Sequence, residues 1–401
     1  MFLSVSMKDI LLKLFSNYSI QGGRTKISFI DQIGNIDWIL LLSTLPLLGA
    51  GLVTMNSFTG DSNFFIKQLI WIIFSIIIFF LLSFVDYHFL RKRWVAVTLF
   101  IISCSSLIIL FMVGKVTNGA ISWFHLGFFS LQPADPIKLV VIIIFAKYFS
   151  RRHIEIANIK HIIVSGIYAF IIFSLVIIQP DFGSAIIIFS IWFGMLLVSG
   201  ISKRHLLTMM FLSLIVFGGL WLFGFKDYQK NRIKNFIHPL TDIRGSGYNA
   251  YQSTIAVGSG RISGKGVGYG TQSRLKFLPE YQTDFIFAAF AEEWGFIGVI
   301  MLFFIYGIII WRIIRIAIKG ETNFEMLFGA GMAIFLIIHF FINIGMNMQL
   351  LPVTGQTLPF LSYGGTHILT EFIGLGILMG MRKYERVAHK DIIKNEFLGV
   401  E

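Results

Sequence analysis

Long runs of apolar residues follow one another along this chain and are separated by short polar segments. Most of these runs reach the roughly 17–25 residues that an α-helix needs to cross a lipid bilayer. The runs are Trp38–Met55, Gln68–Val85, Trp94–Val113, Ile162–Ile178, Phe182–Ser202, Leu206–Phe225, Phe285–Trp311, Met326–Leu351 and Phe360–Met381. The pattern therefore predicts membrane-spanning helices rather than the amphipathic elements of a water-soluble domain.

One further segment, Pro136–Ala146, is apolar but short, and it contains Lys138. Short segments with nearby prolines are tolerated at membrane depth only where they are buried in protein or line a water-filled cavity. Counting it as the fourth helix predicts an all-α polytopic integral membrane protein with about ten transmembrane helices.

The composition supports this class and excludes others. The chain is 56% hydrophobic and only 13% charged, with a mean hydropathy of +0.78, so a soluble domain could not cover itself with polar residues. The single cysteine excludes an internal disulfide. We find no zinc-binding or nucleotide-binding motif, so the sequence requires no metal and no cofactor, and we expect no nucleic-acid partner.

Basic residues indicate how the chain is oriented. Most of the 33 lysines and arginines fall in the N-terminal segment, in alternate loops and in the C-terminal segment. By the positive-inside rule, both termini are then cytoplasmic. This predicts a cytoplasmic amphipathic segment at 1–36, a membrane domain at 37–385 and a cytoplasmic tail at 386–401. The long polar loop at 226–284, between helices seven and eight, is then extracytoplasmic.

This loop carries the most distinctive chemistry of the chain. Arg261, Lys265, Arg274 and Lys276 stand among glycines whose exposed amides could also hold phosphate oxygens. Asp284 ends the loop where an apolar helix begins. Two roles are open for Asp284 at this point, a cap for that helix and a general base.

Other charged residues fall within or beside the apolar runs, where an ionisable group is a functional candidate by default. Asp135 and Lys138 are three residues apart and could form a local ion pair. Asp181 is placed to cap the next helix. Glu292 lies in the eighth span and is expected to pair with cations of the loop, whereas Glu371 has no evident partner in the sequence.

Several longer stretches of the chain are distinctive: GYNAYQSTIAVGSGRISGKGVGYGTQ, LKFLPEYQTDFIFAAFAEEWGFIG, QPDFGSA, and NIGM followed by LLPVTGQTLPFLSYGG. Together they resemble the SEDS family of bacterial cell-wall glycosyltransferases. The resemblance runs from about Asp37 to Lys383. NIGM and LPVTG are more similar to the elongation-type than to the division-type members.

The resemblance implies polymerisation of lipid II into peptidoglycan strands on the outer side of the cytoplasmic (inner) membrane, for elongation and rod shape. It also implies a class B penicillin-binding protein (a transpeptidase) and the elongation machinery as partners. Asp284 matches the family's catalytic aspartate, and Trp123 and Gln132 match a WxxLGxxxxQP pattern. Substrate contacts are expected from Trp123, Gln132, Lys138, Arg261, Lys265, Arg274, Lys276, Glu280 and Glu292. A divalent cation, Mg or Mn, could share the charge neutralisation.

The chain departs from the family pattern at several positions. Ile121-Ser122 stands where a basic pair is common, and Ala134-Asp135 replaces Ser-Glu. Gln349, Gln356 and Thr357 are also unexpected in their segment. Two other functions stay open, a flippase for the same lipid and a non-catalytic scaffold for a partner synthase. A transporter places its binding groups at the midplane, so the outward position of the charged loop favours the transferase.

Overall fold

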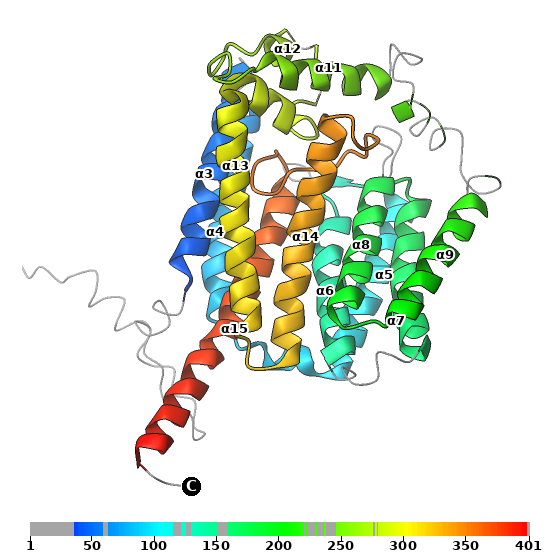
Figure 1. Cartoon of the computed structure of the whole chain (residues 1–401), viewed down its shortest axis with the longest axis vertical. Helices are drawn as coiled ribbons and strands as arrows, with labels where there is room; N and C mark the ends of the chain where they lie inside the picture. The colour runs from blue at the N-terminus through cyan, green and yellow to red at the C-terminus, as the bar shows by residue number, and fades with distance from the viewer. Residues whose placement is uncertain are drawn as a thin grey trace, which may run out of the picture.

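The chain folds into a bundle of long helices with a layer of shorter helices and loops across one end (Figure 1). The computed structural model describes residues 36–58, 63–114, 122–125, 130–150, 159–219, 246–275, 277–278 and 280–398, with a few single positions between 219 and 246. The predicted N-terminal amphipathic segment, much of the 226–284 loop and Lys276 lie outside these residues.

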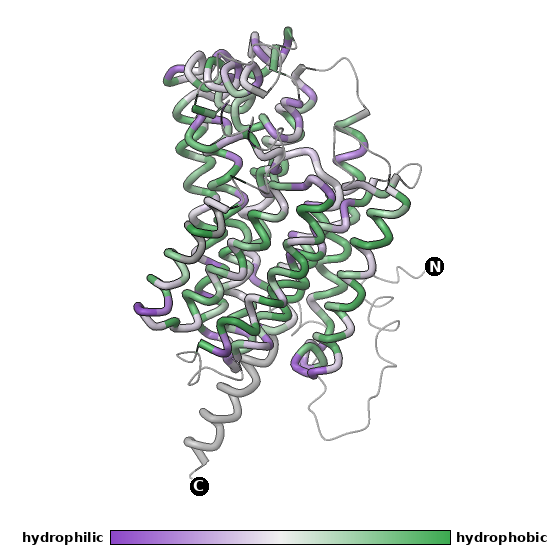
Figure 2. The backbone as a smooth tube through the Cα atoms, turned by 90° about the vertical axis from the view of Figure 1, so that its right-hand side faces the viewer, coloured by the Kyte–Doolittle hydropathy of each residue, from purple (hydrophilic) through white to green (hydrophobic). Residues whose placement is uncertain are grey.

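Each of the ten predicted spans overlaps a helix. The helices are α3 (Trp38–Phe58), α4 (Asn63–Ser83), α5 (Arg93–Val113), α6 (Ala134–Ser150), α7 (Ile159–Ile178), α8 (Phe182–Val198), α9 (Lys203–Gly219), α13 (Ile286–Ile318), α14 (Asn323–Asn347) and α15 (Gly365–Leu398). Among the described residues, α3, α4, α5, α7, α13 and α14 are long and apolar enough to cross a membrane. The backbone is apolar through the middle of the bundle and polar at its ends (Figure 2). The protein is thus a multi-pass membrane protein.

Helix α6 corresponds to the short segment Pro136–Ala146, which was counted as the fourth span. It lies at the centre of the bundle. It packs against α14, α8 and α5, and most of its residues are buried, including Lys138. Its neighbours approach closely through small residues, as is common between membrane helices. A Cβ atom at Gly331 of α14 would lie only 2.6 Å from a side-chain carbon of Ile142 in α6.

Several helix boundaries differ from the predicted ones, and at two of them a turn replaces predicted helix. The last helix begins at Gly365 rather than Phe360, because 358–364 forms a turn in which Phe360 has a φ of +58°. The ninth span ends at Asn347 rather than Leu351, and the chain turns at Gln349, where φ is +56°. Apolar residues occupy both turns, so hydropathy alone does not distinguish these turns from helix.

The described part of the long loop forms two helices, α11 (Ser246–Ser259) and α12 (Thr271–Arg274). Both lie across the end of the bundle where α13 begins, opposite the C-terminal end of α15 (Figure 1). A small hairpin pairs β1 (Phe124–His125) with β2 (Ser130–Leu131) in antiparallel register. The short 3₁₀ helix η1 (Tyr87–Arg91) connects α4 to α5.

Candidate active site around Asp284

Asp284 lies just before α13, at the end of the bundle that α11 and α12 cover. The N-cap of α13 is Phe285, whose own side chain makes no capping hydrogen bond, so Asp284 lies one residue before the cap. Its side chain is half-buried, and its Oδ2 faces Gly355 closely, since a Cβ atom on Gly355 would lie 3.4 Å from it.

Two buried asparagines of α14 hold the backbone of Asp284. The Nδ2 atoms of Asn343 and Asn347 each donate to the Asp284 carbonyl oxygen at 3.0 Å. Asn347 also accepts hydrogen bonds, from Ala288 N at 3.2 Å and from Ser253 Oγ of α11 at 3.1 Å. One side chain thus joins α11, α13 and α14 at Asp284. We did not predict either asparagine, although polar residues four apart on an apolar helix share one face.

Beneath Asp284, a charged pair of α6 contacts the segment that contains Gly355. Lys138 Nζ donates to Asp135 Oδ1 at 2.9 Å, which confirms the predicted ion pair, and it lies 3.5 Å from Gln356 Oε1. The Gln356 carbonyl accepts from Asn343 Nδ2 at 2.7 Å. Lys138 is 1% exposed. It is therefore connected to the Asp284 region through Gln356 and Asn343.

Glu292, one turn before the kink of α13, anchors the glycine-rich loop. Its Oε1 accepts from Lys265 Nζ at 2.7 Å, which confirms the predicted pairing with a loop cation. It also accepts from the backbone nitrogens of Thr271 at 2.8 Å and Gln272 at 3.2 Å. Glu292 is fully buried. The predicted substrate contacts Glu292 and Lys265 are thus bonded to each other.

A kink in α13 makes this anchoring possible. Gly295 has φ 66° and ψ −167°, which interrupts the helix and turns backbone groups towards the loop. The resulting backbone bonds are Lys265 N to Glu292 O, Gly266 N to Glu293 O, Phe296 N to Arg261 O and Ile297 N to Ile262 O, at 2.9–3.1 Å. Glu293 Oε1 additionally accepts from Gly268 N at 2.7 Å. Glycines are required on both sides of this contact. A Cβ atom on Gly264 would collide with the backbone of α13, and a Cβ atom on Gly295 would collide with the backbone of the loop.

The remaining predicted contacts are spread around this region. Arg261 and Arg274 are exposed on the loop, and so is Glu280, whose carboxylate accepts from Thr283 Oγ1 at 3.2 Å. Trp123 is half-buried directly before β1. The side chain of Gln132 contacts Asp181, because its Nε2 donates to Asp181 Oδ2 at 3.0 Å.

Asp181 caps α8 as predicted, because its Oδ1 accepts from Ser184 N at 3.0 Å.

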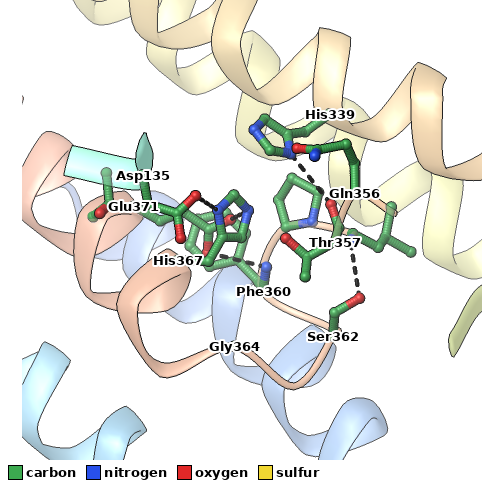
Figure 3. Close-up of polar contacts among 12 residues, drawn as sticks. Asp135, His339, Gln356, Thr357, Phe360, Ser362, Gly364, His367 and Glu371 are labelled. Atoms are coloured by element: carbon green, nitrogen blue, oxygen red, sulfur yellow. Dashed lines mark hydrogen bonds and ion pairs between the residues drawn. The ribbon is translucent and has the colours of Figure 1, made fainter. Parts of the chain in front are cut away.

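A second polar cluster lies deeper, between α6, α14 and α15 (Figure 3). His367 Nε2 lies 2.9 Å from Glu371 Oε1, and His367 Nδ1 lies 3.5 Å from Asp135 Oδ1. The ring centroids of His367 and His339 are 4.5 Å apart. Glu371, for which the sequence showed no partner, also accepts from Phe360 N at 3.1 Å. The four-residue spacing of His367 and Glu371 was the signal available in the sequence.

One further observation concerns metal binding. Within the described ranges, no group of three or more His, Cys, Asp or Glu is arranged to hold a metal ion. Next to Asp284 itself, the described residues offer the amides of Asn343 and Asn347 and the exposed carboxylate of Glu280, which bonds to Thr283.

Comparison with known proteins identifies relatives along nearly the whole chain. The profile of the cell cycle protein family FtsW/RodA/SpoVE matches residues 35–387. Stage V sporulation protein E of Bacillus subtilis is 36% identical over 365 residues, covering 87% of this chain and 98% of the relative. Peptidoglycan glycosyltransferase MrdB of Escherichia coli K12 is 32% identical over 368 residues, covering 92% and 98%.

Solved structures of similar proteins have the same arrangement of helices. A chain from a structure described as the coordination of polymerization and crosslinking by a peptidoglycan synthase complex superposes with a TM-score of 0.75 at 28% identity, covering 87% of this chain and 98% of that chain. The rod shape determining protein RodA of Thermus thermophilus superposes with a TM-score of 0.65 at 26% identity, covering 86% and 96%. The arrangement of helices is therefore shared with these proteins.

Proposed function

Because the chain belongs to the SEDS family (FtsW/RodA/SpoVE) and is a peptidoglycan glycosyltransferase, we propose that it polymerises lipid II with Asp284 as the general base. The reaction joins a sugar hydroxyl of one chain to the anomeric carbon of another, and undecaprenyl pyrophosphate leaves. A base must take the hydroxyl proton while the C–O bond forms, and positive charge must stabilise the leaving pyrophosphate.

The observation that carries the base assignment is how Asp284 is held. Two buried asparagines fix its backbone carbonyl at the start of α13. A catalytic group needs this kind of rigid support, because small displacements from the reacting atoms reduce the rate strongly.

The structure changes which cations we assign to the pyrophosphate. Lys265 is bonded to Glu292, and Lys138 is bonded to Asp135 inside the bundle. Arg261 and Arg274 are exposed on the loop, so they are the better candidates for first contact with the leaving group. A divalent cation could share this charge.

We also propose the finer topology and the biological setting. Ten spans, cytoplasmic termini and an active site outside the inner membrane are supported by the ten helices and the basic loops. Asp284 directly precedes the N-cap of α13, and α13 begins at the end of the bundle opposite the C-terminal end of α15 (Figure 1). The role is cell-wall elongation with a class B penicillin-binding protein. The related structure described as a peptidoglycan synthase complex supports such a partnership.

The alternative is a flippase for the same lipid, and the buried charges of α6 and α15 are what favours it. The test uses purified protein in detergent, where no membrane sides exist, with lipid II and the transpeptidase partner. Glycan strands are expected from the wild type. Asp284→Asn should lower the rate by about 10²–10⁴-fold, because the amide cannot accept a proton.

The matched control is Glu321→Gln, an exposed carboxylate before α14 at the far end of the bundle. It should polymerise like the wild type. An Asp284→Asn variant that keeps more than about a tenth of the wild-type rate would rule out an obligatory general base. No strands from any variant would leave transport or scaffolding.

A further inference from the structure

The turn at 358–364 holds the two residues that precede Asp284. Ser362 Oγ donates to the carbonyl of Thr283 at 2.7 Å, and Tyr363 N donates to the carbonyl of Gln282 at 2.8 Å. Ser362 is buried. The same Oγ accepts from Leu358 N at 2.8 Å, which closes the turn on itself. The position of the Asp284 backbone therefore depends on the shape of this turn as well as on the asparagines.

The turn contains a backbone conformation that needs support. Phe360 has φ +58°, which is uncommon for a bulky residue. Such conformations persist only where surrounding contacts hold them. The contact here is Glu371 Oε2 of α15, which accepts from Phe360 N at 3.1 Å, and Glu371 is fully buried (Figure 3).

Glu371 is itself held in place by charged neighbours. His367 Nε2 lies 2.9 Å from Glu371 Oε1, and the other ring nitrogen faces Asp135, which is paired with Lys138. With His367 protonated, the two carboxylates and the two cations sum to zero charge. Burying an ionic group in this region requires such compensation. The cluster thus keeps a carboxyl oxygen of Glu371 directed at the turn, where it accepts from Phe360 N.

We propose that Glu371 is a positioning residue for Asp284. It acts through the turn: Glu371 holds Phe360, the turn holds Thr283 and Gln282 through Ser362 and Tyr363, and these fix where Asp284 stands. This inference rests on the proposed role of Asp284 as the base. Glu371 touches neither the lipid substrate nor the reacting atoms, so it should affect turnover and not substrate affinity.

The test compares two substitutions that differ in one property. Glu371→Gln keeps a carbonyl that can accept from Phe360 N, whereas Glu371→Leu has similar volume and no acceptor. We expect the Leu variant to lose about 10²-fold in kcat on lipid II, with KM within about twofold, because a displacement of about 1 Å has effects of this size. The Gln variant should recover most of the rate.

Hydrogen exchange supplies a readout that does not depend on catalysis. In the Leu variant, amides of residues 282–285 and 358–364 should exchange faster, and in the Gln variant they should match the wild type. The control is Glu325→Gln, another buried carboxylate, which pairs with Arg91 between η1 and α14. It should change neither the exchange at 282–285 nor kcat.

Ser362→Ala removes the other half of the connection without changing α15, and it covers the case in which Glu371→Leu does not fold. It should also lower kcat with KM preserved, and combining it with Glu371→Leu should add little further loss, because both act on one path. Wild-type kcat in either single variant, an equal loss in the Gln and Leu variants, or fully additive losses would overturn the proposal.

Failure of the base assignment gives a different pattern. If Asp284→Asn stays active while Glu371→Leu still loosens residues 282–285, Asp284 is not the base and the structural connection stands. If Asp284→Asn is inactive and Glu371→Leu leaves both exchange and kcat unchanged, the base stands and the positioning role is wrong.

Discussion

Replacing Glu292 by Gln tests how the glycine-rich loop is kept on the bundle. The substitution conserves shape and removes the charge that accepts bonds from Lys265 Nζ, Thr271 N and Gln272 N. The carboxylate is fully buried, so water does not replace these bonds. The loop should therefore detach more often from the kink of α13.

The size of the effect follows from the three bonds. A hydrogen bond to a charged group contributes about 1.5–3 kcal/mol, and one between neutral groups about 0.5–1.5 kcal/mol, so each bond loses about 1 kcal/mol. Three bonds give about 3 kcal/mol. Since 1.4 kcal/mol is a factor of ten in an equilibrium constant, local opening should increase by about 10²-fold.

The assay is hydrogen exchange measured by mass spectrometry on peptides covering 263–272. These amides should lose about 10²-fold in protection, and the loss should persist in high salt because the Glu292 carboxylate is fully buried. Glu280→Gln is the control, since that exposed carboxylate bonds within its own turn. Protection within about threefold of the wild type in Glu292→Gln would refute the account of a charged anchor.

Three other substitutions test the kink of α13, the support of Asp284 and the role of Trp123. Gly295→Ala forces a positive φ on a residue with a Cβ and should destabilise the protein by about 1–3 kcal/mol, seen as a lower melting temperature; an unchanged melting temperature would contradict the kink. Asn347→Leu removes a donor from the Asp284 carbonyl and should lower turnover by about tenfold at a normal protein level; full turnover would show that Asn343 suffices. Trp123→Ala should reduce turnover per molecule; if only the protein level falls, Trp123 is a membrane anchor.

The sequence by itself determined the class of the protein, the ten helices and the local ionic contacts. Apolar runs become helices because backbone groups in lipid must bond within their own segment. The Asp135–Lys138 pair and the Asp181 cap were predictable because their partners are three residues apart on one helix or at its start. The stretches that resemble the SEDS family, including LKFLPEYQTDFIFAAFAEEWGFIG with Asp284, were sufficient to indicate the family.

Only the tertiary structure decided how Asp284 is supported and which cations remain accessible. Asn343 and Asn347 reach Asp284 from 59 and 63 residues away, and Glu371 reaches Phe360 across a turn that hydropathy predicted as helix. Helical periodicity reports which residues share a face of one helix, and it says nothing of which helix lies opposite. Polar groups within a bundle must find partners wherever packing brings them, so these long-range contacts follow from how α6, α13, α14 and α15 pack together.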